Sequence, residues 1–138
     1  MKRNMFWGLT AVVLALVMNV PFANAQSAKA NIPFDFSVSG TAMPAGIYTV
    51  SEIGDGEARV ASVQSSTTIL VHVQREERLD HQSPRIVFHK YGDKYFLAEV
   101  WSGAGNSGLE FPASKWENEM RTAFKNTGGG TEVVVALR

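Results

Sequence analysis

Apolar and polar side chains alternate with a period of two through much of the chain after residue 30, which is typical of β-strands with one buried face. The first such segment, 31–39, has its apolar positions at Ile32, Phe34, Phe36 and Val38. Pro33 has no backbone N–H to donate to a neighbouring strand. We therefore expect this strand to lie at a sheet edge or to begin its pairing after Pro33.

Further β-rich runs follow and are separated by turn residues. The predicted strands cover 47–53, 58–63, 67–73, 85–91, 94–101 and 131–137. Proline and glycine mark turns at 43–46 and 54–56. The polar segment 75–84 predicts a loop of roughly ten residues, longer than an ordinary hairpin loop. Such loops often border binding sites, but a solvated connection is the favoured interpretation.

The strongest pattern is a hairpin, in which two β runs flank the turn Gly92-Asp93. Its predicted cross-strand partners are Tyr91 with Lys94, His89 with Phe96, Val87 with Ala98, and Ile86 with Glu99. This register places Tyr95, Glu99 and Trp101 on one face and His89 on the other. Because both faces are rich in apolar groups, we expect the hairpin to be covered on both sides.

A single helix is predicted before the last strand. Ser114 is a suitable N-cap, and Glu117 completes a capping box. The apolar stripe of the helix, which runs to about Asn126, consists of Trp116, Met120, Ala123 and Phe124. We expect this stripe to pack on the sheet. Glycines at 128–130 then end the helix, and their order between helix and strand is not that of a phosphate-binding loop.

These elements predict a mainly β fold, an antiparallel barrel or sandwich of about seven or eight strands with one amphipathic helix before the last strand. The order of elements is similar to that of small ligand-binding barrels such as lipocalins, although the G-x-W motif expected near the first lipocalin strand is missing. No internal repeat or linker divides 26–138. This segment is therefore predicted to be a single domain.

The N-terminus has the organisation of a secretory signal peptide. Lys2 and Arg3 precede an uncharged apolar run over 5–20, and Ala23-Asn24-Ala25 supplies the small residues of a cleavage site. The run is shorter than the ~20 residues that cross a membrane. We predict that 1–25 is removed and that 26–138 is a soluble periplasmic or extracellular protein with no membrane span.

Composition excludes several classes of site and partner. Cysteine is absent, so the fold has no disulfides, no lipid-modified cysteine and no thiolate metal site. The chain has 13 basic and 13 acidic residues, and loss of Lys2 and Arg3 changes its net charge from 0 to 11 − 13 = −2. Because a phosphate-binding protein needs a basic surface, nucleic acid is not an expected partner.

The histidines do not form a recognisable metal or catalytic motif. His72, His81 and His89 lack the spacing of a zinc pair, although His72 and His89 can meet in space on neighbouring strands. No catalytic set, metal site or cofactor is predicted.

Glu99 is the best-placed candidate for a ligand site, because it is the only carboxylate in the middle of a strongly apolar strand. A buried carboxylate needs a partner or a raised pKa. With Tyr95 and Trp101 on the same predicted face, Glu99 forms the predicted ligand-binding set. The alternative, which is favoured, is that Glu99 pairs with a basic side chain of the same hairpin, Arg85 or Lys90, or faces solvent.

Three segments together with the signal peptide carry a family resemblance. They are 31–36 (NIPFDF), 43–48 (MPAGIY) and 87–101 (VFHKYGDKYFLAEVW). The chain resembles a group of small exported bacterial proteins of uncharacterised function that are frequent in soil acidobacteria. The resemblance covers most of 26–138 and implies compartment and fold. It implies no reaction, cofactor or catalytic residue.

Two classes of function remain open. The favoured one is a non-enzymatic periplasmic or secreted binding or structural domain, whose partner is a small apolar ligand or an envelope protein. The alternative is a small hydrolase or isomerase that uses Glu99 with His89 or His72. This alternative requires a histidine close to Glu99, and the predicted register places His89 on the opposite face.

Overall fold

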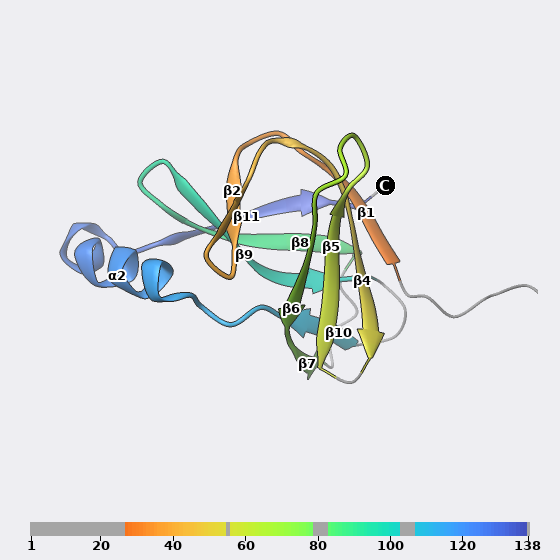
Figure 1. Cartoon of the computed structure of the whole chain (residues 1–138). Coiled ribbons are helices and arrows are strands. Elements are labelled where there is room, and N and C mark those ends of the chain that lie inside the picture. The colour runs from red at the N-terminus through yellow and green to blue at the C-terminus, as the bar shows by residue number, and fades with distance from the viewer. Residues whose placement is uncertain (1–26, 55, 79–82, 103–106, 138) are drawn as a thin grey trace, which may run out of the picture.

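The structure, a computed structural model, describes residues 27–54, 56–78, 83–102 and 107–137. Two β-sheets pack against each other, and one helix lies at the end of the molecule that is remote from β4 and β5 (Figure 1). The predicted signal peptide, 1–25, lies outside the described residues, as does His81. Within the described ranges, no helix is long and apolar enough to cross a membrane.

The first sheet contains four antiparallel strands. In spatial order they are β1 (Ser27–Ile32), β4 (Gly46–Gly54), β5 (Glu57–Ser62) and β6 (Thr68–His72). Their inward face is apolar and includes Ala30, Ile32, Tyr48, Val50, Ala58, Val60 and Val71. The period-two pattern of the sequence therefore marks the buried face of this sheet.

The second sheet is built on the β8–β9 hairpin. In spatial order its main strands are β11 (Thr131–Ala136), β8 (Arg85–Tyr91), β9 (Lys94–Trp101), β10 (Ser107–Glu110) and β7 (Gln74–Glu77). A short hairpin of β2 (Phe36–Val38) and β3 (Thr41–Met43) joins this sheet through one parallel pair, Ser37 with Phe96. Because β8 occupies one edge of β9, β10 and β2 share the other edge.

The chain crosses between the two sheets three times, after β1, after β3 and after β6, and the first and last of these corners show different local features. Pro33 lies between β1 of the first sheet and β2 of the second, so the predicted single strand over 31–39 is wrong. Since proline cannot donate to a strand ladder, the strand breaks there. At the last corner, between β6 and β7, the N–H of buried Val73 donates to the carbonyl of Gly56 at 2.9 Å. The sheets form a sandwich rather than a closed barrel.

Aromatic rings fill the space between the sheets. Phe36 lies edge-to-face against Tyr48 and Phe88, with ring centroids 5.0 Å and 5.4 Å apart. Phe34 contacts Phe88 edge-on at 4.9 Å and stacks on Tyr95 at 3.8 Å. Such pairs are worth about 0.5–1.5 kcal/mol beyond the area that they bury. Because the chain has no cysteine, these contacts take the place of covalent links between the sheets.

The prediction of a mainly antiparallel β fold with one helix before the last strand is confirmed, although the described residues form eleven strands rather than seven or eight. Two of the extra strands lie in segments predicted as loops. They are β7, within 75–84 apart from its first residue, and β10, which begins in the glycine-rich segment 102–108, where the sequence indicates turns, and extends beyond it. Strand β7 is an edge strand made only of polar residues, and charged edges of this kind resist pairing with other chains.

A β-bulge in β9 changes the register of the central hairpin. Near the turn the predicted pairs are confirmed, including His89 with Phe96. Farther along, Val87 lies opposite Glu99, so the predicted pairs of Val87 with Ala98 and of Ile86 with Glu99 are wrong. Ala98 is the extra residue, and its carbonyl accepts the N–H of Phe111 at 2.8 Å. Side chains after Ala98 therefore lie on the face opposite to the predicted one.

The helix α2 (Lys115–Ala123) begins where the sequence predicts and is followed by a 3-10 turn, η1 (Lys125–Thr127). The hydroxyl of Ser114 accepts the N–H of Glu117 at 3.1 Å, which confirms the N-cap. The expected burial of the apolar stripe is wrong, since Trp116 is 38 % exposed and Glu117 is the buried residue of the helix. Figure 1 shows why, because α2 lies beside the turn of the β8–β9 hairpin rather than across the sheets.

We predict that Gly108→Ala lowers the free energy of unfolding by about 1–3 kcal/mol, the usual effect of overpacking. A Cβ at Gly108 would lie 2.5 Å from the ring of buried Trp101, which packs directly on this glycine. Urea denaturation measures the change. Gly54→Ala is the matched control, because a Cβ there meets nothing within 4 Å. Equal loss in both variants would contradict the packing of Trp101 on Gly108.

Candidate functional site

The bulge separates the three side chains of the predicted ligand-binding set. Glu99 and Trp101 lie opposite Val87 and Arg85, on the face of the second sheet that points away from the first sheet; we call it the outer face. Tyr95 lies opposite Lys90 and packs against the core between the sheets. The structure therefore brings Glu99 and Trp101 together and places Tyr95 elsewhere.

Glu99 is held by a closed set of polar contacts on the outer face. The guanidinium of Arg78 donates to both carboxylate oxygens, at 3.2 Å and 3.1 Å, and the indole N–H of Trp101 donates at 2.8 Å. Arg78 also lies over the Trp101 ring, 4.6 Å from its centroid. The partner of Glu99 is thus an arginine just after β7 rather than Arg85 or Lys90. With its oxygens already paired, Glu99 is a structural contact of the outer face.

Two further carboxyl groups, those of Glu76 and Glu110, also lie on the outer face. Glu110 is opposite Glu99, and Glu76 is on the next strand. A hydrogen bond to Glu110 raises the pKa of Glu76, burial and the charge of Glu110 raise it further, and Arg78 lowers it. Two adjacent carboxyl groups that share a proton show this shift. The pairing of β7 with β10 therefore includes a contact that favours a protonated carboxyl.

Neither of the two described histidines, His72 and His89, pairs with Glu99. His72 is exposed on β6. His89 lies on the same face as Glu99, contrary to the predicted register, because the bulge moves Glu99 across the sheet. The Nδ1 atom of His89 nevertheless lies 3.1 Å from a carboxylate oxygen of Glu117. Among the described residues, no group of three His, Asp or Glu side chains is arranged to hold a metal ion.

A groove of about 490 Å³ lies at the turn end of the hairpin. Its walls come from 35–37, 42–44, 93–95 and Trp116. The volume falls within the ~300–1,000 Å³ of typical small-molecule sites. Among the described residues, β2 pairs with β9 only through Ser37 and Phe96, which leaves the edge of β9 nearer the turn without a neighbouring strand and makes room for the groove.

Aromatic side chains in the groove are fixed by neighbours outside it. Tyr95, one of the predicted site residues, lines the groove while its ring stacks on Phe34 at 3.8 Å. Trp116 stands edge-on against Phe96 at 5.0 Å and stays partly open to solvent. Because contacts with Phe34 and Phe96 fix these two rings, a bound molecule would meet side chains that are already in position.

The charged groups of the groove carry an excess of one negative charge, with Asp35 and Asp93 set against Lys94. One oxygen of Asp35 accepts the N–H of Ala45 at 2.9 Å, which fixes that carboxylate beside the β3–β4 turn. The charge of Asp35 also contributes, after burial, to raising the pKa of the Tyr48 hydroxyl. The groove therefore combines aromatic surface with a field that favours cations.

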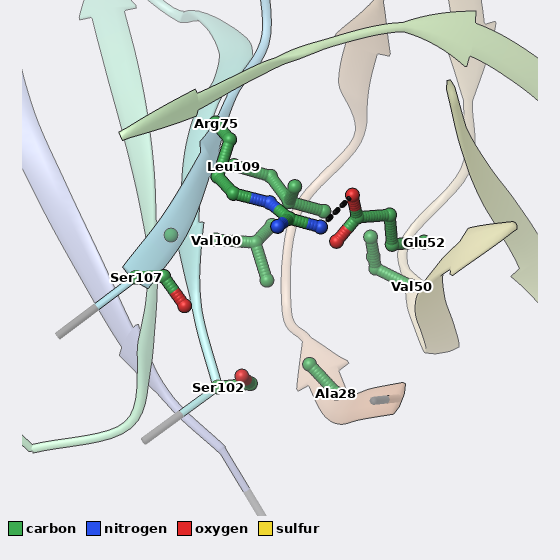
Figure 2. Close-up of a pocket in the computed structure, with 9 residues that line it drawn as sticks. Ala28, Val50, Glu52, Arg75, Val100, Ser102, Ser107 and Leu109 are labelled. Atoms are coloured by element: carbon green, nitrogen blue, oxygen red, sulfur yellow. Dashed lines mark hydrogen bonds and ion pairs between the residues drawn. The ribbon is translucent and has the colours of Figure 1, made fainter. Parts of the chain in front are cut away.

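A separate cavity between the sheets is too small for an organic ligand. Figure 2 shows its lining, with Val50 on one side and Val100 and Leu109 on the other. Its volume is about 20 Å³, enough for one water molecule. Glu52 and Arg75 form an ion pair across it at 2.5 Å, which joins β4 to β7. This cavity is therefore a small packing gap between the sheets, bridged by the ion pair of Glu52 and Arg75.

Most residues of the groove were not predicted from the sequence. Asp93 and Lys94 were interpreted only as turn and strand residues, and Trp116 as core. The groove forms from three segments that are distant in the sequence, so no local pattern marks it. Tyr95 was predicted as a site residue only together with Glu99 and Trp101, from which the structure separates it.

No family model, curated protein or solved structure matches this chain. The function is therefore argued from the geometry of the site.

We predict that Glu99→Gln lowers the free energy of unfolding by about 0.5–1.5 kcal/mol, the range for a charge-assisted contact that is only partly buried. The glutamine keeps an acceptor for Trp101 but removes the charge that holds Arg78. Chemical denaturation followed by Trp fluorescence measures the change. Glu119→Gln, on the exposed face of α2, is the control and should have less effect. An unchanged Glu99→Gln protein would show that the ion pair adds nothing to stability.

Proposed function

We propose that this chain is an exported, non-enzymatic binding protein that holds a small organic ligand in the groove beside Trp116. The observation that carries the proposal is a groove of ligand size that combines three aromatic side chains with three charged ones. The predicted signal peptide over 1–25 supports export. The resemblance to small exported bacterial proteins points to the same compartment.

The lining of the groove favours a ligand with an apolar body and a positive charge. The exposed ring of Trp116 can attract cations as well as apolar groups, whereas the ring of Tyr95 is already stacked on Phe34 and lies 5.4 Å from the ammonium of Lys90. Asp35 and Asp93 outnumber Lys94, so an ammonium group gains more than a carboxylate does. We infer that the ligand is an organic ammonium with an aromatic or aliphatic body, a refinement of the small apolar ligand expected from the sequence.

The contacts of Glu99 and His89 support binding over catalysis. A general acid and base must lie within hydrogen-bond reach of the same reacting group. Glu99 is paired with Arg78 and Trp101, whereas His89 is paired with Glu117. The hydrolase or isomerase hypothesis requires Glu99 to act with His89 or His72. Glu99 and His89 are each committed to another partner, and His72 is exposed on β6 of the other sheet.

Export is tested by the N-terminus of the protein recovered outside the cytoplasm. We expect intact-mass and N-terminal sequencing data to show a chain that begins at Gln26, because Ala23 and Ala25 occupy the positions that signal peptidase inspects. Ala25→Lys should block this cleavage. Recovery of uncleaved wild-type protein in the cytoplasm would contradict export.

Ligand class is tested with three probes that share one phenyl-ethyl skeleton and differ in charge. Calorimetric titration with phenethylammonium, 2-phenylethanol and phenylacetate should give affinities in that order, because the groove attracts positive charge. Asp93→Asn should weaken phenethylammonium binding by about 2- to 5-fold, the effect of one exposed charge pair. The same substitution should leave 2-phenylethanol unchanged.

Glu119→Gln is the matched control for this titration, since it removes one exposed carboxylate of α2 that does not line the groove. Phenylacetate binding as tightly as phenethylammonium would overturn the ligand class. The binding function itself would be overturned if no probe bound and native mass spectrometry of the exported protein showed no retained small molecule.

A further inference from the structure

The helix that supplies Trp116 to the groove is attached by a buried carboxylate. Glu117 is only 3 % exposed, and it is the buried residue of α2. Its Oε2 atom lies 3.1 Å from Nδ1 of His89 on β8 and 3.1 Å from a guanidinium nitrogen of Arg121. Since a buried carboxylate without partners is strongly unfavourable, the position of Glu117 depends on these two partners.

The apolar contacts of the helix are few by comparison. Trp116 meets Phe96 through one edge-to-face contact and is partly exposed. A further attachment is polar, because Nε of Arg121 donates to the hydroxyl of Tyr91 at 3.2 Å, and the ring of Phe124 at the C-cap lies close to Gly92 of the hairpin turn. Trp116, which forms part of the groove wall, directly precedes Glu117, which anchors the helix. The position of the Trp116 side chain therefore depends on the contacts of Glu117.

We propose that Glu117 is the positioning residue of the groove, and that the proton on His89 sets how firmly α2 holds Trp116 in place. The consequence for ligand binding rests on the proposed function. The anchoring itself does not, because it concerns only contacts within the chain.

Several charged groups face His89. Glu117 and Arg121 approach from α2, and Glu132 lies directly opposite on β11. On its own strand the nearest ring is that of Tyr91, with centroids 6.5 Å apart. The hydrogen bond to Glu117 is the largest influence and raises the pKa of His89, and the charges of Glu117 and Glu132 raise it further. Burial and Arg121 act in the opposite direction but do not cancel the rise.

The sign of the pH effect follows from this raised pKa. A histidine whose pKa is higher in the folded protein stabilises the fold fully below its unfolded pKa of about 6.5 and loses that contribution as the pH rises through the folded value. The anchor is therefore strongest at mildly acidic pH. Because Arg121 stays charged and bound to Glu117, the helix loosens at higher pH but does not lose its anchor entirely.

The test follows the two tryptophans of the exported protein by ¹⁹F NMR after labelling with 5-fluorotryptophan, with each resonance assigned by Trp→Phe replacement. Trp116 reports on α2, and Trp101, which lies on β9 of the second sheet, is an internal reference. Between pH 5 and pH 9 we expect the Trp116 resonance to shift in a single transition centred above pH 6.5, with a smaller response from Trp101. Binding of phenethylammonium, which stays charged over most of this range, should weaken by about 2-fold or more from pH 6 to pH 8.5.

Two variants separate this mechanism from a general effect of pH. His89→Gln keeps a side chain that can donate to Glu117 but cannot titrate, so it should abolish the Trp116 transition. His72→Gln, on the exposed side of β6, is the matched control and should leave the transition intact. Glu117→Gln should also abolish the Trp116 transition. If the Glu117→Gln protein does not fold, the result for His89→Gln decides the test alone.

The outcomes distinguish the anchor from the binding function. A Trp116 resonance that does not titrate, or that titrates equally in His89→Gln, would overturn the role of His89 and Glu117. A normal Trp116 transition without binding of any probe would leave the anchor standing and overturn the proposed ligand site.

Discussion

The β8–β9 hairpin must be covered on both of its faces, and the rest of the structure is arranged around that requirement. Its inner face carries Ile86, Phe88, Leu97 and Val100, which only a second sheet can bury. Its outer face carries Phe96 and Tyr91, which are covered at the turn end by α2. Without cysteine, the sandwich depends on these two contacts, because no covalent link supports them.

The bulge at Ala98 then divides the outer face into two regions of different character. Beyond the bulge, Glu99 and Trp101 are closed off by Arg78, and every polar atom that they present has a partner. On the turn side, β9 has an open edge, and the groove with Tyr95 lies beside it. The extra residue therefore moves Glu99 and Trp101 to the outer face, where they stabilise the fold, whereas Tyr95 precedes the bulge, keeps its predicted face and lines the groove.

What the sequence predicts depends on how local the cause is. Strands with alternating apolar residues were found, and so was the start of α2, because Ser114 and Glu117 interact within one turn. Strand β7 was missed, since its polar residues form a strand only when β10 pairs with them. The bulge in β9 was also missed, because nothing in an apolar run of residues distinguishes the extra residue from its neighbours. The burial of Glu117 was missed for the same reason, because its partner His89 is far away in the sequence.

Anchoring a helix through a carboxylate rather than an apolar stripe has a physical consequence. Buried ion pairs add little net stability compared with well-packed apolar side chains, but they fix orientation through directional contacts and make it depend on protonation. In α2 the apolar residues are left half exposed while Glu117 is buried, so the position of the helix is defined by charge. The groove wall formed by Trp116 can therefore shift with α2 without disturbing the aromatic core, because the contacts that join Phe34, Phe36 and Phe88 to one another do not involve the helix.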